Sequence, residues 1–304
     1  MTKKFEEGIA HVDGAFCPVG EARLPLLDWG FLRSDACQDT VSVWDGAFFR
    51  LDDHLERFER SITSLRMKCP HDRDELREIA LDAVRLTGFR KAYLQLIMTR
   101  GRPPIGSRDL RLAKNNFFMF CVPYISIATL EQQDNGLQLI VSDIQRIPAT
   151  SLDPRIKTYH WLDFEMGLFQ AYDQGGDTVV LVDNEGNVTE GPGFNLFAVK
   201  DGKLLTPEAG CLDGMTRDTV FELCNETNLD YSLATLPADE LGDMDELFIS
   251  STAGGLMPIG KVGGKTIGES GAGPVTKRLR DLYWSKRRSG WHATLIDYQD
   301  ASQA

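Results

Sequence analysis

The chain of 304 residues contains no apolar run of eighteen residues and no Cys-x-x-Cys pair. Without such a run, a membrane-spanning helix is not expected. The first residues, Met-Thr-Lys-Lys-Phe-Glu-Glu, lack the apolar segment of a secretory signal. The six cysteines and five histidines show no spacing typical of a metal site. We therefore expect a cytoplasmic protein with reduced thiols and no bound metal.

An excess of basic residues is also missing. The 33 Lys and Arg residues stand against 45 Asp and Glu residues, which gives a net charge of −12. Nucleic acids and anionic membrane surfaces attract basic proteins, so neither is expected as the main partner. A hydrophobic fraction of 42% is that of an ordinary globular protein, and the length allows two domains with separate cores.

Short strands separated by turns are predicted for the first fifty residues. Asp13-Gly14 and Asp45-Gly46 each stand between apolar runs, which is a strong β-hairpin pattern. From Leu51, apolar residues recur at helical spacing. A helix is predicted there, with Asp52 or Asp53 as its N-terminal cap.

The rest of the chain predicts an α+β protein in two halves. The spacing predicts a helix over 72–86 and strands over 91–99 and 117–124. Between the strands, residues 100–116 form a loop rich in Arg, Pro and Gly, and a loop that long is usually functional or mobile. We expect an N-terminal domain over 1–125, a linker over 126–136 and a C-terminal domain over 137–304. In the C-terminal domain, strands are predicted at 137–141, 178–182, 194–199, 203–205 and 246–250, and helices at 159–173, 215–225 and 274–287.

One lysine and one glutamate suggest the chemistry. Lys157 stands just before a predicted helix with apolar residues around it, where burial would lower its pKa and favour a nucleophilic amine. Glu190 precedes the turn Gly191-Pro192-Gly193. Taken singly, each is better explained as a surface residue. Together they match the needs of pyridoxal phosphate, which uses a lysine for a Schiff base and a carboxylate at its pyridine nitrogen.

Two segments could hold the phosphate group of that cofactor. Gly214-Met215-Thr216 and Ser251-Thr252 combine small residues with hydroxyl groups, and the N–H groups of a helix start attract anions. A phosphate dianion also favours an arginine fork, and Arg57 is the candidate. From spacing alone, Arg57 is better explained as a solvated helix charge beside Glu56 and Arg60.

Taken in order along the chain, these segments resemble the class IV aminotransferases of fold type IV. That pyridoxal-phosphate family includes branched-chain and D-amino-acid aminotransferases and (R)-selective amine transaminases. The resemblance runs from about Asp28 to Pro258, and five matching segments in the right order make it specific. It implies a two-domain α+β fold like that of D-amino-acid aminotransferase. A smaller N-terminal α/β domain would precede a larger C-terminal domain with a barrel-like sheet.

The resemblance also implies roles for single residues. In Arg-Leu-Asp-Asp-His-Leu-Glu-Arg at 50–57, Arg57 resembles the phosphate arginine. Lys157 resembles the catalytic lysine that binds the cofactor, and Glu190 the carboxylate at its pyridine nitrogen. The remaining cofactor-binding positions resemble a cup for the phosphate, formed by Met215, Thr216, Ser251 and Thr252.

Within the family, (R)-selective amine transaminases fit better than the other branches. Leu162 replaces the tyrosine that branched-chain enzymes carry five residues after the lysine, and Tyr93-Leu94-Gln95 lacks the arginine of their Tyr-x-Arg pattern. No Arg-x-His pattern of D-amino-acid aminotransferases follows Arg100. The segments that resemble the amine transaminases are 25–35, 41–46, 48–54 and 191–195.

The resemblance implies ping-pong transamination between a primary amine, (R)-configured, and a keto acid such as pyruvate, in a homodimer. Gln38 replaces an aromatic residue in the substrate pocket and makes it more polar, and Phe194 is a second candidate substrate contact. A mobile arginine of the 100–116 loop is implied for the carboxylate. Arg108 is favoured, with Arg102 and Arg111 as alternatives. A D-amino-acid or branched-chain aminotransferase remains the alternative within the family. A non-catalytic binding protein is disfavoured, because every cofactor position holds a competent residue type.

Overall fold

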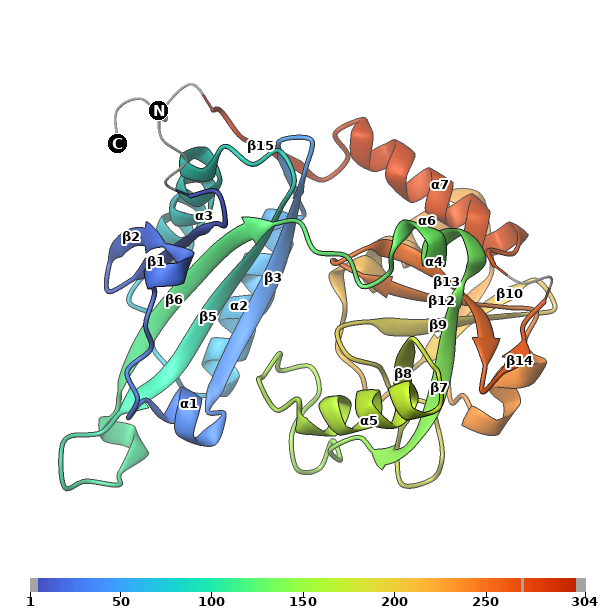
Figure 1. The fold of residues 1–304 in the computed structure, drawn as a ribbon, viewed down its shortest axis with the longest axis horizontal. Helices are drawn as coiled ribbons and strands as arrows, with labels where there is room; N and C mark the ends of the chain where they lie inside the picture. Colours follow the sequence, from blue (N-terminus) through green and yellow to red (C-terminus); the bar gives the residue numbers. More distant parts are fainter. Residues whose placement is uncertain (1–4, 269–270, 299–304) are drawn as a thin grey trace. The chain divides into compact units, whose positions relative to one another are not determined.

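The computed structural model describes residues 5–268 and 271–298, which form two compact units (Figure 1). The first unit holds the described residues up to Ile125, residues 156–160 and those from Gly290. The second holds residues 126–155 and 161–289. The short segment that carries Lys157 thus belongs to the first unit, although the chain on either side of it belongs to the second.

The first unit is built on one antiparallel sheet of seven strands, in the order β15-β4-β3-β5-β6-β1-β2. Both predicted hairpins are confirmed, since Asp13-Gly14 joins β1 to β2 and Asp45-Gly46 joins β3 to β4. All four turn residues have positive φ, which matches the twist of the paired strands. The strands are β1 (Ile9–Val12), β2 (Ala15–Pro18), β3 (Ala36–Trp44), β4 (Ala47–Phe49), β5 (Ala92–Arg102), β6 (Lys114–Pro123) and β15 (Ala293–Leu295).

Two long helices, α2 (Leu51–Ser64) and α3 (Arg73–Thr87), pack against this sheet, and the short α1 (Trp29–Arg33) lies beside β5. The helix predicted from Leu51 is confirmed, but its predicted cap is wrong. The N-cap residue is Arg50, with φ 56° and no side-chain capping bond. Asp52 and Asp53 fall inside the first helical turn, and Asp53 accepts a hydrogen bond from Arg50 Nε at 2.6 Å instead. The unit also contains the 3₁₀ helices η1 (Val19–Glu21) and η2 (Leu110–Leu112).

Alternation along β3 gives the sheet two different faces. Cys37, Val41 and Val43 enter the core with the apolar residues of α2, as the period of two requires. Gln38 and Thr40 point to the opposite face. The sheet therefore has an apolar face that builds the core and a second face with polar side chains.

The loop predicted over 100–116 is shorter than expected, because both flanking strands extend into it. β5 runs to Arg102 and β6 begins at Lys114, with a bulge between Thr99 and Arg102. The buried carboxylate of Asp28 holds this bulge, since it accepts hydrogen bonds from the Thr99 hydroxyl at 2.7 Å and the Gly101 amide at 3.1 Å. The loop proper is thus limited to residues 103–113.

The second unit contains a mixed sheet of eight strands, in the order β11-β10-β9-β12-β13-β7-β8 with β14 beside β13. Its β7–β8, β7–β13 and β10–β11 pairs are parallel, and the other pairs are antiparallel. The two sheets and their helices confirm the predicted α+β class. The strands are β7 (Leu137–Gln145), β8 (Thr178–Val182), β9 (Asn195–Lys200), β10 (Lys203–Pro207), β11 (Tyr231–Ala234), β12 (Glu246–Ser251), β13 (Gly255–Val262) and β14 (Lys265–Thr266).

The helices of the second unit are α4 (Leu130–Asn135), α5 (Leu162–Asp173), α6 (Met215–Thr227), α7 (Pro274–Arg288) and the 3₁₀ helix η3 (Ala238–Asp243). Residues 126–136, predicted as a linker, include α4, which a capping box of Thr129 and Gln132 begins. Helix α5 starts at Leu162 rather than at Tyr159, because the residues before it pair with β3. No helix among the described residues is long and apolar enough to cross a membrane.

Candidate active site

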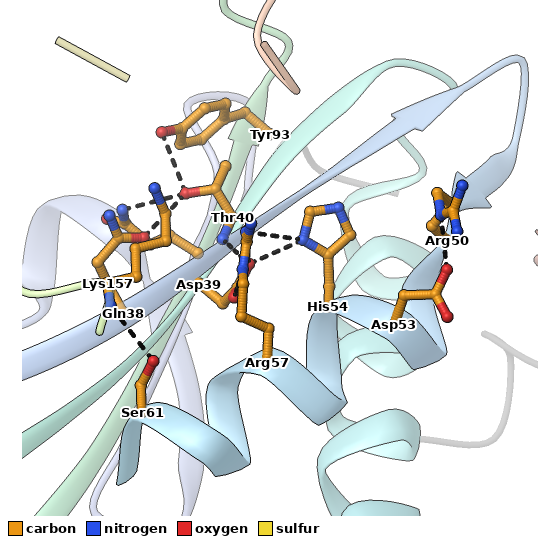
Figure 2. Close-up of polar contacts among 11 residues, drawn as sticks. Gln38, Asp39, Thr40, Arg50, Asp53, His54, Arg57, Ser61, Tyr93 and Lys157 are labelled. Atoms are coloured by element: carbon orange, nitrogen blue, oxygen red, sulfur yellow. Dashed lines mark hydrogen bonds and ion pairs between the residues drawn. The ribbon is translucent and has the colours of Figure 1, made fainter. Parts of the chain in front are cut away.

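Lys157 is positioned by its backbone. Its carbonyl accepts a hydrogen bond from the Gln38 amide at 2.9 Å, and its amide donates to the Ser61 hydroxyl of α2 at 3.3 Å (Figure 2). The next residue, Thr158, pairs with Cys37. The half-buried lysine is therefore held between the start of β3 and the helix α2.

Arg57 is not the solvated helix charge that its spacing favoured. It is buried, and its Nε and Nη2 atoms donate to Asp39 Oδ2 and Oδ1, each at 2.8 Å. His54, one helical turn earlier, has its Nδ1 atom 2.8 Å from Asp39 Oδ1 (Figure 2). A carboxylate only accepts hydrogen bonds, so Nδ1 of His54 carries the proton. One fully buried carboxylate on β3 thus orients two side chains of α2.

The pKa directions of this group follow from burial and charge. Burial alone would raise the pKa of Asp39, but the charge and hydrogen bonds of Arg57 and His54 outweigh it and hold that pKa well below its usual range. Burial lowers the pKa of His54 from its ordinary 6.5, and the Asp39 carboxylate opposes this only in part. The group therefore consists of an ionised aspartate, a charged arginine and a neutral histidine.

The two predicted substrate side chains of the first unit lie in different surroundings. Gln38 is only 3% exposed, and its Oε1 atom accepts a hydrogen bond from the Thr40 hydroxyl at 3.1 Å. Arg108 is exposed in the 103–113 loop and, within residues 5–268 and 271–298, makes no hydrogen bond or ion pair. Arg111 is instead tied to Asp109, at 2.7 Å between Nη2 and Oδ2. Arg102, at the end of β5, is exposed.

Glu190 is fixed within the second unit. It is 6% exposed, and its Oε1 atom lies 3.3 Å from the guanidinium of Arg146. Its Oε2 atom accepts a hydrogen bond from the Leu212 amide at 3.0 Å. Arg146 in turn donates to Asp163 of α5 at 2.6 Å. The carboxylate therefore has a set orientation, as a group facing a pyridine nitrogen would need.

The start of α6 has the features of an anion site. Gly214 is its N-cap residue and provides no side-chain cap, while Met215 and Thr216 are the first helical residues and both are buried. A Cβ atom at Gly214 would lie 2.1 Å from Asn195 Oδ1, so a larger residue here would displace the Asn195 side chain. Asn195 donates to the Leu212 carbonyl at 2.9 Å and fixes the chain just before the helix. Backbone N–H groups at such an end suit a phosphate.

The remaining predicted residues also lie in the second unit. Ser251 is buried at the end of β12, and its hydroxyl donates to the Gly193 carbonyl at 2.7 Å. Thr252 follows it and is partly exposed. Phe194 is buried in the core of this unit, with its ring over Gly191, so its substrate role stays a prediction.

Comparisons with known proteins identify the family. The family model for amino-transferase class IV matches residues 36–262. The chain belongs to the class IV aminotransferases. A branched-chain-amino-acid aminotransferase of Pseudomonas aeruginosa is 31% identical over 93% of this chain and 94% of its own. A putative branched-chain-amino-acid aminotransferase of Methanocaldococcus jannaschii is 29% identical over 94% of this chain and 99% of its own.

Solved structures show the same fold. The branched-chain amino acid aminotransferase of T.th., with pyridoxamine 5′-phosphate, superimposes with a TM-score of 0.89. It is 28% identical, over 96% of this chain and 100% of its own. The predicted fold type IV is thereby confirmed, and so is the prediction of a pyridoxal-phosphate-dependent aminotransferase.

The residues present fit pyridoxal phosphate. The first unit supplies an amine at Lys157 and a buried, oriented guanidinium at Arg57. The second unit contains the oriented carboxylate of Glu190 and the helix start at Gly214, which has no side-chain cap. An amine, two phosphate donors and a carboxylate are the groups this cofactor uses. The individual roles stay predictions, which the proposal below takes up.

Four residues beside these groups were not predicted from the sequence. Asp39 orients Arg57 and His54, while Arg146 contacts Glu190 and Asn195 fixes the chain before α6. A signal existed for two of them. Asp39 is a charged residue inside a strand that reads as buried, and His54 stands one turn before Arg57 on the same helix face. Asn195 ends the segment 191–195 that carries part of the family resemblance, whereas Arg146 has no local signal.

Stability should depend on pH through His54. Because its pKa is lowered in the folded state, the unfolded chain takes up a proton below pH 6.5 that the folded chain rejects. The His54 contribution is therefore complete above pH 6.5 and is lost as pH falls. We expect the free energy of unfolding to decrease by up to about 1.4 kcal/mol per pH unit from this group. Urea titrations of wild type and His54→Gln between pH 7.5 and 5 should show a flatter slope for the variant.

The surface substitution Arg60→Gln, on the same helix, is the matched control and should keep the wild-type slope. A His54→Gln protein whose stability falls as steeply as that of wild type would contradict the neutral state of His54.

Proposed function

We propose that this aminotransferase transfers the amino group of an (R)-configured primary amine to a keto acid such as pyruvate. The observation that carries the proposal concerns the neutral side chain of Gln95. This residue takes the place of the arginine in the branched-chain pattern, and the structure shows its amide hydrogen-bonded to Thr40 and Tyr159. A neutral amide gives no charge to hold the carboxylate of an amino-acid donor. A simple amine requires none.

The roles of the cofactor-binding residues follow from their chemistry. Pyridoxal phosphate supplies an electron-withdrawing ring that stabilises the charge left at the donor carbon when its proton is removed. Lys157 Nζ binds the cofactor covalently and, once the donor amine displaces it, moves that proton as base and acid. Glu190 holds a proton at the pyridine nitrogen. The phosphate is bound by Arg57 and by the remaining predicted positions, Met215, Thr216, Ser251 and Thr252.

The acceptor half-reaction needs a cation for the keto acid, and Arg108 is our choice. Its side chain is exposed and makes no ion pair within the described part of the chain, whereas Arg111 is bound to Asp109. A side chain without such a bond moves at little cost. Arg102 lies at the end of β5 and is less free to travel with the loop.

A branched-chain aminotransferase is the alternative that the relatives' names favour, with a D-amino-acid aminotransferase as the second. Against the first stand two side chains. Leu162 takes the place of the tyrosine of that pattern and is exposed, and Gln95 takes the place of the arginine. Phe194, the remaining proposed substrate contact, is buried and does not discriminate between these alternatives.

We further propose a homodimer, which an apolar stripe on α5 supports. Leu162, Met166, Phe169 and Tyr172 recur every three or four residues and are each at least half exposed. A contiguous exposed apolar stripe of this kind is typical of an interface. The cytoplasmic location stays a prediction.

A donor panel tests the proposed reaction. With pyruvate as acceptor, (R)-1-phenylethylamine should be consumed at least about tenfold faster than its (S) enantiomer, and L-leucine should be slower still. For L-leucine, the physical reason is that its carboxylate meets the neutral Gln95 where the branched-chain pattern has an arginine. A missing charge-assisted contact of this kind costs roughly 1.5–3 kcal/mol, at least about tenfold in rate. Alanine formation is the measurement. L-leucine as the best donor would establish the branched-chain alternative instead.

Arg108→Ala should affect only the acid substrate. We expect the KM for pyruvate to rise about tenfold or more, since a bidentate arginine–carboxylate contact is lost, while the KM for the amine stays within about twofold. Initial rates against each substrate provide both constants. Arg111→Ala, from the same loop, is the control and should change neither. Equal changes for amine and acid in Arg108→Ala would remove this residue from the acid site.

A further inference from the structure

Arg217 is a buried arginine of the second unit, outside the residues with proposed cofactor roles. It is the third residue of α6 and is 4% exposed. Its Nε atom makes no hydrogen bond within residues 5–268 and 271–298. A cation in the first turn of a helix is also repelled by the positive end of the helix dipole. Because a buried donor without a partner is costly, this position needs an explanation beyond packing.

The contacts of Arg217 fix residues 207–214, the segment that joins β10 to α6. The Nη2 atom donates to the carbonyl of Pro207, where the segment begins. The Nη1 atom lies 3.7 Å from the half-exposed carboxylate of Asp213, and the guanidinium carbon lies 5.4 Å from the centre of the Phe221 ring. From the first turn of the helix, Arg217 thus contacts both ends of the segment that precedes it.

The same segment contacts the proposed cofactor groups of this unit. Its Leu212 amide donates to Glu190 Oε2 at 3.0 Å, and its last residue, Gly214, is the N-cap of α6. Its turn at Gly210 packs against Thr189, the residue before Glu190, since a Cβ atom at Gly210 would lie 2.7 Å from Thr189 Cγ2. A shift of the segment would therefore move the partner of the carboxylate and the start of the helix together.

Two further side chains hold the segment. Asn195 donates to the Leu212 carbonyl at 2.9 Å. The Cys211 sulfur lies 3.6 Å from the Pro207 carbonyl oxygen, and burial raises the pKa of this thiol, so it stays protonated and donates. A thiol is a weak donor and an amide is neutral, whereas the bond from a guanidinium is charge-assisted. Among these three side chains, Arg217 therefore makes the charge-assisted contact.

We infer that Arg217 is a positioning residue for the cofactor: by fixing residues 207–214, it places the Leu212 amide at Glu190 and the N–H groups at the start of α6. Its charge also adds to the positive potential of the helix start, which a phosphate dianion bound there would offset. A position that is unfavourable in a helix alone becomes favourable with the anion in place. The inference rests on the proposed roles of Glu190 and of the α6 start.

Cofactor affinity tests the inference without turnover. Pyridoxal phosphate is titrated into apoprotein prepared from the holoenzyme, and tryptophan fluorescence gives the dissociation constant. In Arg217→Met this constant should rise about tenfold or more, because the segment loses its charge-assisted bond. Arg217→Lys keeps the charge and a donor and should stay within about threefold of wild type. The matched control is Arg278→Met, which should bind like wild type, because Arg278 is exposed and donates to the Thr227 carbonyl at the other end of α6.

A spectroscopic readout separates positioning from a purely structural role. Glu190→Gln is the reference, because a neutral amide does not hold a proton at the pyridine nitrogen and is expected to move the pH midpoint of the visible absorption band. Arg217→Met should move this midpoint in the same direction, whereas Arg217→Lys and Arg278→Met should keep the wild-type value. A loss of packing alone would lower the melting temperature of the apoprotein and leave the midpoint and the dissociation constant unchanged.

Three results overturn the inference. These are a wild-type dissociation constant in folded Arg217→Met, an Arg217→Lys protein that binds as weakly as Arg217→Met, and a midpoint that Arg217→Met leaves unmoved where Glu190→Gln moves it. If Arg217→Met does not fold, Arg217→Gln takes its place, with an expected rise of about threefold or more, and a wild-type constant again overturns the inference.

The proposed function is tested separately. These measurements use no amine donor, so their outcome does not depend on the donor class. An unmoved midpoint in Glu190→Gln counts against the proposed role of Glu190, and the affinity series then supports or overturns the role of Arg217.

Discussion

The buried carboxylate of Asp39 is the interaction on which the first unit's part of the site depends. It stands in the middle of β3, receives both hydrogen bonds of the Arg57 fork and orients His54. A buried charge without partners would be very costly, so strand and helix are held in one register by this contact. The same strand carries Gln38 and Thr40 on its other face. One strand thereby positions Arg57, the proposed phosphate arginine, on one face and two polar side chains near Lys157 on the other.

The segment around Lys157 follows from the same strand. Its residues pair with Ala36, Cys37 and Gln38, so main-chain hydrogen bonds place the lysine. This pairing also explains why α5 begins at Leu162. Glu190 is fixed independently in the second unit, by Arg146 and the Leu212 amide. Each unit therefore orients its own proposed cofactor-binding residues by local contacts.

Local patterns in the sequence were sufficient for much of the fold. Two β-turns, at Asp13-Gly14 and Asp45-Gly46, depend only on neighbouring residues, and so does the apolar period of α2. A single sequence was therefore enough to predict them. The start of α5 and the partners of Glu190 depend on residues far apart in the chain, and no spacing reveals them. The burial of Arg57 could not be predicted from spacing either, because its partner Asp39 lies eighteen positions away on β3. The family resemblance implied the roles of Arg57 and Glu190. The structure shows the contacts that orient their side chains.

All proposed roles depend on a covalent bond between Lys157 and the cofactor. Its most direct test is borohydride reduction of the yellow holoenzyme, followed by peptide mass mapping. We expect a pyridoxyl phosphate mass on Lys157 alone, no fixed cofactor in Lys157→Ala, and full labelling of Lys157 in the surface control Lys68→Ala. Reduced cofactor on a different lysine, or an active Lys157→Ala enzyme that borohydride does not inhibit, would contradict it.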